Sequence, residues 1–130
     1  MPGGRLVSDA AARVDLAAAW GVECLPTEIG KSADQILAAA SAGQLEALVI
    51  GGVDPYDMQQ PSVNALEKAF VISLEMRPSA ITEFADVIFP IAAVTEKSGS
   101  FMSWAGTSRS FEKAAPDADH RSDAYVLSIL

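Results

Sequence analysis

Three short, almost uninterrupted apolar runs stand in the middle of the chain, at residues 47–50, 70–74 and 86–89. Runs of this length without polar alternation are typical of strands buried on both faces, as in a parallel sheet. Short helical patterns at residues 61–69 and 79–85, opened by a proline and a serine, separate them. Strands joined by helices in this way pair in parallel. The sequence therefore predicts an α/β fold, a Rossmann-like three-layer unit in which a short parallel sheet of about three to four strands is flanked by helices.

Further local signals lie on either side of this unit. An aspartate at an N-cap position opens a helical pattern over residues 9–20, and a Ser-Ala-Asp-Gln capping box opens another over residues 32–42, each followed by a glycine. A serine opens a last helical pattern at residues 122–129. Residues 95–111 combine glycine, serine and aromatic side chains without a period, which predicts an irregular flap or hairpin. Residues 116–120 suit a polar turn.

Length and composition limit the possible classes of protein. A chain of 130 residues predicts a single domain, residues 1–130, because two separate cores need a longer chain. Hydrophobic residues make up 50% of it, which argues against disorder. The net charge of −8 argues against nucleic acid and anionic membrane surfaces as partners, since both attract clustered positive charge. No apolar run approaches the roughly 18 residues that cross a bilayer, so we expect no membrane insertion.

Cysteine and histidine are scarce. Cys24 and His120 are the only residues of their kinds, which rules out an intrachain disulfide and any iron–sulfur cluster or structural zinc held by this chain alone. Cys24 suits a small buried hydrophobic position, and His120 suits a solvated surface position. The sequence has no serine–histidine–acid arrangement and no Walker loop. We therefore expect neither catalytic nor metal-binding residues in it.

The first candidate binding residues follow the first apolar run, because ligands of parallel sheets bind outside the carboxyl ends of the strands. Gly51 and Gly52 would let a ligand approach the backbone, and Asp54 could accept a hydrogen bond from a ribose hydroxyl. The loop lacks the third glycine of a dinucleotide fingerprint, and Pro55 interrupts the helix that would supply amide donors. The simpler interpretation is that the two glycines turn the chain at a strand end.

The other candidates are acidic. Glu75 ends the second run and suits either ligand binding or an exposed ion pair with Arg77, the simpler interpretation. Asp86 begins the third run, on the side opposite the usual site, and suits a cap or a turn. Glu96, close to Gly99, suits either a cofactor amide or backbone donors that anchor the flap, and we favour the anchoring role.

Linked motifs give the chain a family resemblance. Residues 84–93, Phe-Ala-Asp-Val-Ile-Phe-Pro-Ile-Ala-Ala, followed at residues 95–101 by Thr-Glu-Lys-Ser-Gly-Ser-Phe, resemble the signature of the molybdopterin oxidoreductase superfamily. Residues 47–55 are similar to the preceding strand of that signature and its glycine-containing turn, and residues 73–75 with 79–83 are similar to the segment between. Within the superfamily, the glycine turn, the second strand and the flap tryptophan most resemble the large iron–sulfur subunit, the G subunit, of NADH:quinone oxidoreductase, respiratory complex I.

This resemblance implies a function. The chain would be a C-terminal structural domain, without a complete active site, of a subunit that helps to carry electrons from NADH to quinone. It would hold no cofactor, because the iron–sulfur clusters of such subunits belong to an N-terminal part. Its partners would be other peripheral-arm subunits of complex I, on the cytoplasmic side at the inner face of the plasma membrane. Where superfamily members keep the pterin, this region helps to hold a guanine-dinucleotide half, so the vestigial cofactor contacts would be Gly51, Gly52, Asp54, Glu75, Glu96 and Gly99.

The flap departs from the family pattern, in which phenylalanine leads to asparagine, glutamate, glycine and arginine. Ser103, Ala105 and Thr107 stand at the three polar positions, and only Gly106 is kept. The loss of a carboxylate and a guanidinium favours a scaffold over cofactor binding. Two alternatives stay open: a cofactor-binding domain of a molybdopterin-dependent oxidoreductase that holds a guanine-dinucleotide pterin, and a free-standing nucleotide or acyl-cofactor module. The apolar half-helix at residues 122–130 predicts a fragment of a longer protein.

Overall fold

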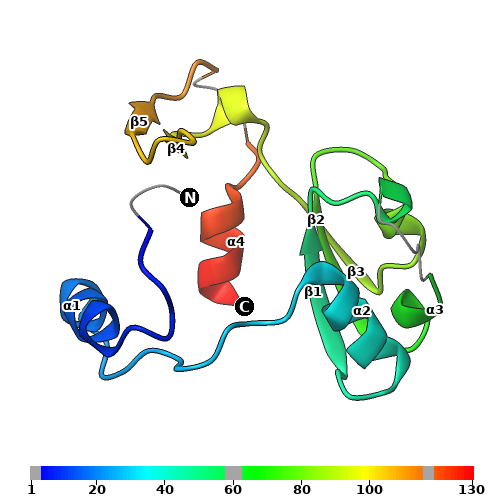
Figure 1. The fold of residues 1–130 in the computed structure, drawn as a ribbon. Helices are drawn as coiled ribbons and strands as arrows, with labels where there is room; N and C mark the ends of the chain where they lie inside the picture. The colour runs from blue at the N-terminus through cyan, green and yellow to red at the C-terminus, as the bar shows by residue number, and fades with distance from the viewer. Residues whose placement is uncertain (1–3, 58–62, 116–118) are drawn as a thin grey trace. The chain divides into compact units, whose positions relative to one another are not determined.

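The computed structural model describes residues 4–57, 63–115 and 119–130, without the side chain of residue 64. The chain divides into two compact units (Figure 1). The first comprises Met1–Lys31 and Ser100–Ser110, and the second comprises Ser32–Gly99 and Phe111–Leu130. The expectation of one domain over residues 1–130 stays a prediction. Within the described ranges, no helix combines the length and the apolar character needed to cross a membrane.

The first unit contains helix α1, Ala10–Trp20, at the position expected from the sequence. The side chain of Asp9 caps its start by accepting hydrogen bonds from the amides of Ala11 and Ala12. Gly21 ends the helix in the left-handed conformation, with φ of +68°. The following loop holds Cys24, which is exposed, so the expectation of a buried cysteine is wrong. A free cysteine is usually buried as a small apolar residue, but no element of the described chain covers this loop residue.

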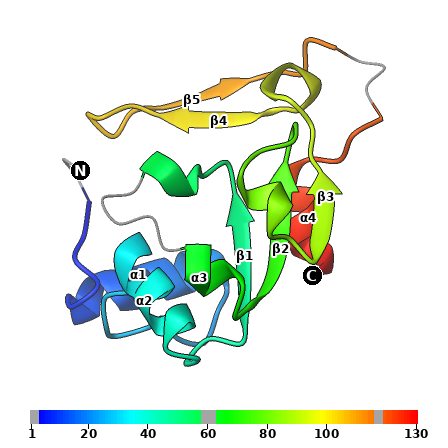
Figure 2. The same cartoon turned by 90° about the vertical axis from the view of Figure 1, so that its right-hand side faces the viewer.

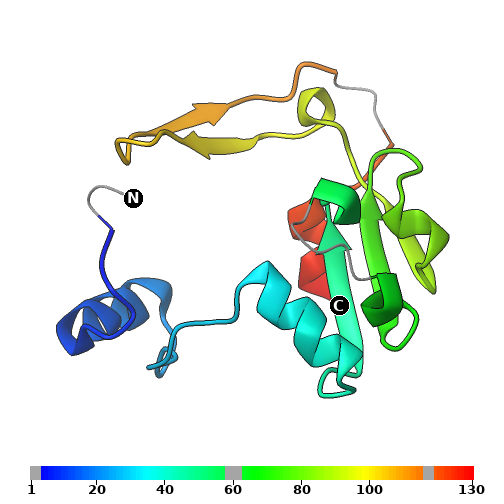
Figure 3. The ribbon, with the colours of Figure 1, turned by 45° about the vertical axis from the view of Figure 1, so that its right-hand side comes forward.

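The predicted flap is a two-stranded hairpin of β4, Gly99–Met102, and β5, Ser108–Phe111 (Figure 3). A short 3₁₀ helix, Val94–Glu96, precedes it. At its tip the Ser103 amide donates to the Thr107 carbonyl at 2.9 Å, and the Thr107 amide donates to the Ser103 hydroxyl at 3.2 Å. Two of the residues that depart from the family pattern therefore close the turn of the hairpin.

The second unit is built on a parallel sheet of three strands in the order β1-β2-β3 (Figure 2). The strands are β1, Ala47–Gly51, β2, Phe70–Glu75, and β3, Val87–Pro90. They coincide with the three apolar runs to within one residue, so the predicted parallel α/β sheet is confirmed. One further parallel bridge joins Ile91 to Arg121 beyond the end of β3.

Helices lie on both sides of this sheet, as a three-layer arrangement requires. Helix α2, Ala33–Ser41, and the short helix α3, Val63–Leu66, cover one face, and helix α4, Asp123–Ile129, lies on the other (Figures 1 and 3). The expected capping box is present at α2, where Ser32 and Gln35 exchange side-chain and backbone hydrogen bonds. Residues 61 and 116–118, which the sequence placed at a helix start and in a polar turn, lie outside the described residues.

The segment at residues 79–85 contains a shorter helix than expected. It is a 3₁₀ helix, Ile81–Glu83, and no side chain caps it. The Thr82 hydroxyl instead donates to the Ser79 carbonyl at 2.7 Å and accepts from the Ser79 amide at 3.0 Å. The cap predicted for the Ser79 side chain is therefore wrong, because the threonine three residues later satisfies the backbone of this turn.

The apolar core lies between the sheet and the α2–α3 layer. Its buried members are Ala40, Leu48, Ala65, Leu66, Ala69, Val71 and Ile81. The prediction that β1 is buried on both faces is wrong, since Leu48 is buried whereas Val49, on the opposite face, is 52% exposed. The reason is that β1 is an edge strand with its helical cover on one side. Central strand β2 is better covered, and Val71 and Leu74, on its two faces, are both buried.

Candidate functional site

The sheet brings the predicted binding loops to one edge. Gly51, the last residue of β1, stands beside Leu74 in the register, and Glu75, the last residue of β2, stands beside Pro90. The three strands run in the same direction, so the segments that follow them leave the sheet at the same end. We call residues 51–57 the glycine loop. The loop and Glu75 therefore occupy the position at which parallel sheets bind ligands.

The glycine loop needs its glycines for reasons of backbone geometry. A Cβ atom on Gly51 would lie 3.3 Å from both the Cβ and the carbonyl oxygen of Leu74, closer than most real Cβ contacts. Gly52 has φ of +63°, a left-handed conformation that favours glycine. These constraints support the interpretation that both glycines turn the chain at a strand end. They explain the two residues without a ligand.

Asp54 is used within its own loop. Its Oδ1 atom accepts a hydrogen bond from the Tyr56 amide at 2.9 Å, and its carbonyl accepts one from the Asp57 amide at 3.1 Å. This is the arrangement by which an aspartate stabilises a tight turn. The turn leads into the 3₁₀ helix Pro55–Asp57. The hydrogen bond that Asp54 could accept from a ribose hydroxyl stays a prediction.

Glu75 links the segments that follow all three strands. Its Oε1 atom accepts a hydrogen bond from the Gly52 amide at 3.3 Å, and its carbonyl accepts one from the Ile91 amide at 3.1 Å. Among the residues that the structure describes, no ion pair joins it to Arg77. The expected exposed ion pair is therefore absent from that part of the chain. The carboxylate of Glu75 points to the glycine loop instead.

Asp86 fixes the beginning of the central strand. Its Oδ2 atom accepts from the Val71 amide at 2.7 Å, and its own amide donates to the Val71 carbonyl at 2.9 Å. One aspartate thus satisfies both backbone groups of a residue whose exposure is 0%. In place of the expected cap or turn within its own segment, Asp86 makes hydrogen bonds to the neighbouring strand. The sequence pattern alone does not identify Val71 as the partner.

Glu96 anchors the base of the flap, the role favoured from the sequence. Its Oε2 atom accepts from the Ala93 amide at 3.0 Å and lies 3.4 Å from Nδ1 of His120. Beside it, Lys97 pairs with Asp123 at the start of α4. The side chain of His120 is 55% exposed, so the expected surface position is confirmed, and Glu96 is an acidic neighbour that the sequence did not indicate.

Gly99 begins strand β4 with an aromatic ring against it. A Cβ atom there would lie 3.1 Å from the ring of Phe111 on the partner strand β5. Close packing of the hairpin thus accounts for this glycine. In the described chain, no hydrogen bond or ion pair connects the flap-base residues Glu96, Lys97, His120 and Asp123 to the glycine loop.

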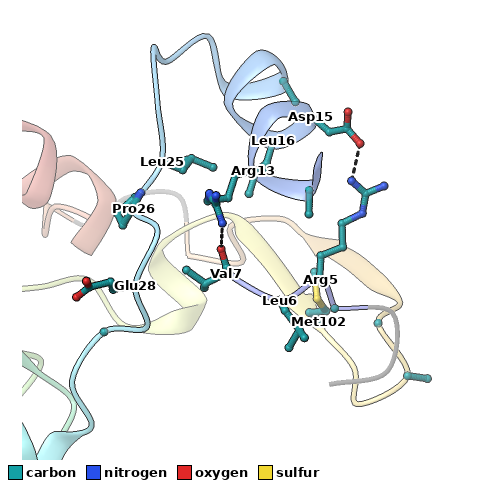
Figure 4. Close-up of a pocket in the computed structure, with 16 residues that line it drawn as sticks. Arg5, Leu6, Val7, Arg13, Asp15, Leu16, Leu25, Pro26, Glu28 and Met102 are labelled. Carbon is teal, nitrogen blue, oxygen red and sulfur yellow. Dashed lines mark hydrogen bonds and ion pairs between the residues drawn. The ribbon is translucent and has the colours of Figure 1, made fainter. Parts of the chain in front are cut away.

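A hollow opens on the described surface of each unit. The smaller, about 260 Å³, lies in the second unit beside β1 and α2, and its wall includes Gly51, Val53, Pro55 and apolar side chains of the core layer. The larger, about 970 Å³, lies in the first unit between α1, the loop after it and the hairpin tip (Figure 4). Neither wall groups polar side chains as a reaction centre would.

Three of the four charged side chains that line the larger hollow have internal partners (Figure 4). Arg5 pairs with Asp15 at 2.6 Å, and Nη1 of Arg13 donates to the Val7 carbonyl at 2.5 Å. The hydrogen bond from Arg5 to Asp15 raises the pKa of Arg5, so this guanidinium stays charged at any physiological pH. Across the described residues there is no group of three or more histidine, cysteine, aspartate or glutamate side chains placed to bind a metal ion.

Comparison with known proteins places these features in a family. The model of the molybdopterin oxidoreductase family matches residues 5–129. The chain is 46% identical to the G subunit of NADH-quinone oxidoreductase from Mycobacterium bovis over 93% of its length, and 45% identical to the G subunit from Streptomyces coelicolor over 100%. It is 32% identical to formate dehydrogenase H of Escherichia coli over 98%. The chain spans 16% of the length of the two G subunits and 18% of the dehydrogenase. From its first helix to its last, this chain belongs to the molybdopterin oxidoreductase family.

Proposed function

We propose that this chain is a structural domain of the large iron–sulfur subunit of an NADH:quinone oxidoreductase, with no active site of its own. Two G subunits of such enzymes match nearly the whole chain at 45% and 46% identity, against 32% for formate dehydrogenase H. The electron transfer would take place in other parts of the same subunit. This domain would act as a scaffold within that subunit.

The observation that carries this proposal is the internal use of the candidate binding groups. Glu75 binds the Gly52 amide, Asp54 binds the Tyr56 amide, and Glu96 binds the Ala93 amide. In each case a carboxylate that a ligand would need holds the backbone of the chain instead. Each carboxylate keeps further acceptor sites, but the backbone amide that it binds fixes its position.

The fit of a pterin dinucleotide to these residues is poor. Its phosphates are anionic, whereas the glycine loop carries Asp54 and Asp57 and receives the carboxylate of Glu75. The flap positions that are polar in the family pattern are Ser103, Ala105 and Thr107, and two of them close the hairpin turn. We therefore derive no binding or chemical step that involves this group.

The proposal extends to the surroundings of the domain. Its partners would be other peripheral-arm subunits of complex I, and it would lie on the cytoplasmic side at the inner face of the plasma membrane. The iron–sulfur clusters would be held by the part of the subunit that this chain does not include. The six candidate contacts would then be remnants of a cofactor site rather than parts of a working one.

Ligand titration tests the structural role directly. The ¹⁵N-labelled chain would be titrated with guanosine, with GMP and with a pterin dinucleotide while its amide shifts are recorded. We expect no saturable shift at residues 51–54. Saturable shifts there with guanosine or the pterin dinucleotide would favour the alternative, a cofactor-binding domain of a molybdopterin-dependent oxidoreductase.

A second experiment tests the absence of redox chemistry. The purified chain would be analysed for iron and molybdenum after expression with both metals supplied, and assayed for NADH oxidation with ferricyanide as the electron acceptor. We expect no stoichiometric metal and no activity above buffer. Stoichiometric iron, or turnover of NADH, would contradict the proposal.

A further inference from the structure

Three backbone donors of the glycine loop bind acceptors within the protein. Between residues 52 and 57, the Gly52 amide donates to Glu75, the Tyr56 amide to the Asp54 side chain, and the Asp57 amide to the Asp54 carbonyl. Pro55 has no amide hydrogen to offer. A loop that binds phosphate works in the opposite way, by aiming free amides at the ligand. Three of the five amides between residues 52 and 57, those of Gly52, Tyr56 and Asp57, therefore already have acceptors within the protein.

Glu75 differs from the other acceptors because it comes from another strand. It lies 23 residues after Gly52 in sequence, and its carboxylate reaches back from the end of β2 to the end of β1. Its main chain is fixed at the same point by the hydrogen bond from the Ile91 amide. The Glu75 backbone is thus tied to the segment after β3, and its side chain is tied to the glycine loop.

We infer that the Glu75 carboxylate acts as an internal anion of the glycine loop, holding the Gly52 amide so that the loop rejects ligands that carry phosphate. The contact of 3.3 Å is at the long end of the hydrogen-bond range, which makes it a weak bond. The negative charge of the carboxylate also repels a second anion. Asp54 and Asp57 add negative charge to the same loop. The inference rests on the proposed structural function and names the residue that would enforce it.

The test compares four versions of the full 130-residue chain: the unaltered protein, Glu75→Gln, Glu75→Ala and the control Glu83→Ala. Glu83 is an exposed glutamate of the same unit, in the 3₁₀ helix that follows β2. Glutamine keeps an oxygen acceptor but removes the charge, and alanine removes both. Amide exchange at Gly52 measures the hydrogen bond, and titration with inorganic phosphate measures the exclusion of anions.

We expect exchange at Gly52 to be about threefold faster in Glu75→Ala than in the unaltered chain, with Glu75→Gln in between, because a weak hydrogen bond is lost. Phosphate should give a saturable shift at Gly52 in Glu75→Ala and none in the unaltered chain or in Glu83→Ala. If alanine unfolds the chain, Glu75→Gln carries the phosphate test, since a neutral amide no longer repels the anion.

Three results would overturn the inference: equal exchange at Gly52 in all four proteins, phosphate binding at Gly52 while Glu75 is intact, or faster exchange without any phosphate binding in the variants. The last would mean that Glu75 only braces the loop. Failure of the proposed function gives a different result, because saturable binding of guanosine, which has no phosphate, would contradict the structural role and leave this inference standing.

Discussion

Replacement of Asp86 should remove a hydrogen bond that holds the central strand of the sheet and should destabilise the second unit. The carboxylate accepts the Val71 amide at 2.7 Å, a short bond to a charged acceptor, and Val71 is 0% exposed. Alanine would leave that amide without its partner, which costs about 1–3 kcal/mol, and we expect Asp86→Ala to lower the free energy of unfolding by about 2 kcal/mol. Asparagine keeps an oxygen in place but loses the charge, so about 1 kcal/mol is expected for Asp86→Asn.

The assay has to follow the unit that contains the sheet. Both tryptophans, Trp20 and Trp104, belong to the first unit, so their fluorescence reports the wrong part of the chain. Urea unfolding followed by far-UV circular dichroism gives the free energy, and amide exchange at Val71 reports the bond itself. Glu83→Ala, an exposed change in the same unit, should stay within about 0.5 kcal/mol. Equal stability of Asp86→Ala and Glu83→Ala, or an unchanged exchange rate at Val71, would refute the reasoning.

Three further substitutions test other parts of the second unit and the turn before it. Gly52→Ala places a side chain on a residue with φ of +63° and should lower the free energy of unfolding in urea by about 1 kcal/mol. The control Gly30→Ala, with no atom within 4 Å of the new Cβ, should lower it much less. Equal losses in the two variants would contradict the backbone argument. Ser32→Ala removes the α2 capping box and should cost about 1 kcal/mol by the same assay, and no loss would mean that α2 does not depend on its cap. Ser73→Ala removes a buried hydroxyl that has no hydrogen-bond partner among the described residues. The free energy of unfolding should therefore stay unchanged or rise by up to about 1 kcal/mol. A loss above about 1 kcal/mol would reveal a partner for that oxygen.

Signals within a few residues of one another made most of the secondary structure predictable. The cap at Asp9 and the capping box at Ser32 depend on bonds to amides two or three residues later, so their sequence spacing is also their geometry. The three apolar runs located the strands because burial requires apolar side chains wherever the sheet is covered. The anchoring role favoured for Glu96 is also local, because its carboxylate accepts a hydrogen bond from an amide three residues earlier.

Contacts between distant segments could not be predicted from the sequence. Arg77, two residues from Glu75, was the obvious partner for it, yet the register of parallel strands brings the Gly52 amide to its carboxylate. The exposure of Val49 was missed for a related reason, since an apolar run shows that a strand is apolar on both sides without showing whether both sides are covered.

The amino-acid order by itself determined where most helices and strands lie, because caps, periods and turn glycines act over a few neighbouring residues. It also indicated the molybdopterin oxidoreductase family, since the family signature is a pattern of residues along the chain. Only the tertiary structure decided what the acidic residues do: strand register and helix cover select the partners of Glu75, Asp86 and His120 across 15 to 24 positions of sequence. Such long-range pairing depends on how the whole chain folds, and no local pattern encodes it.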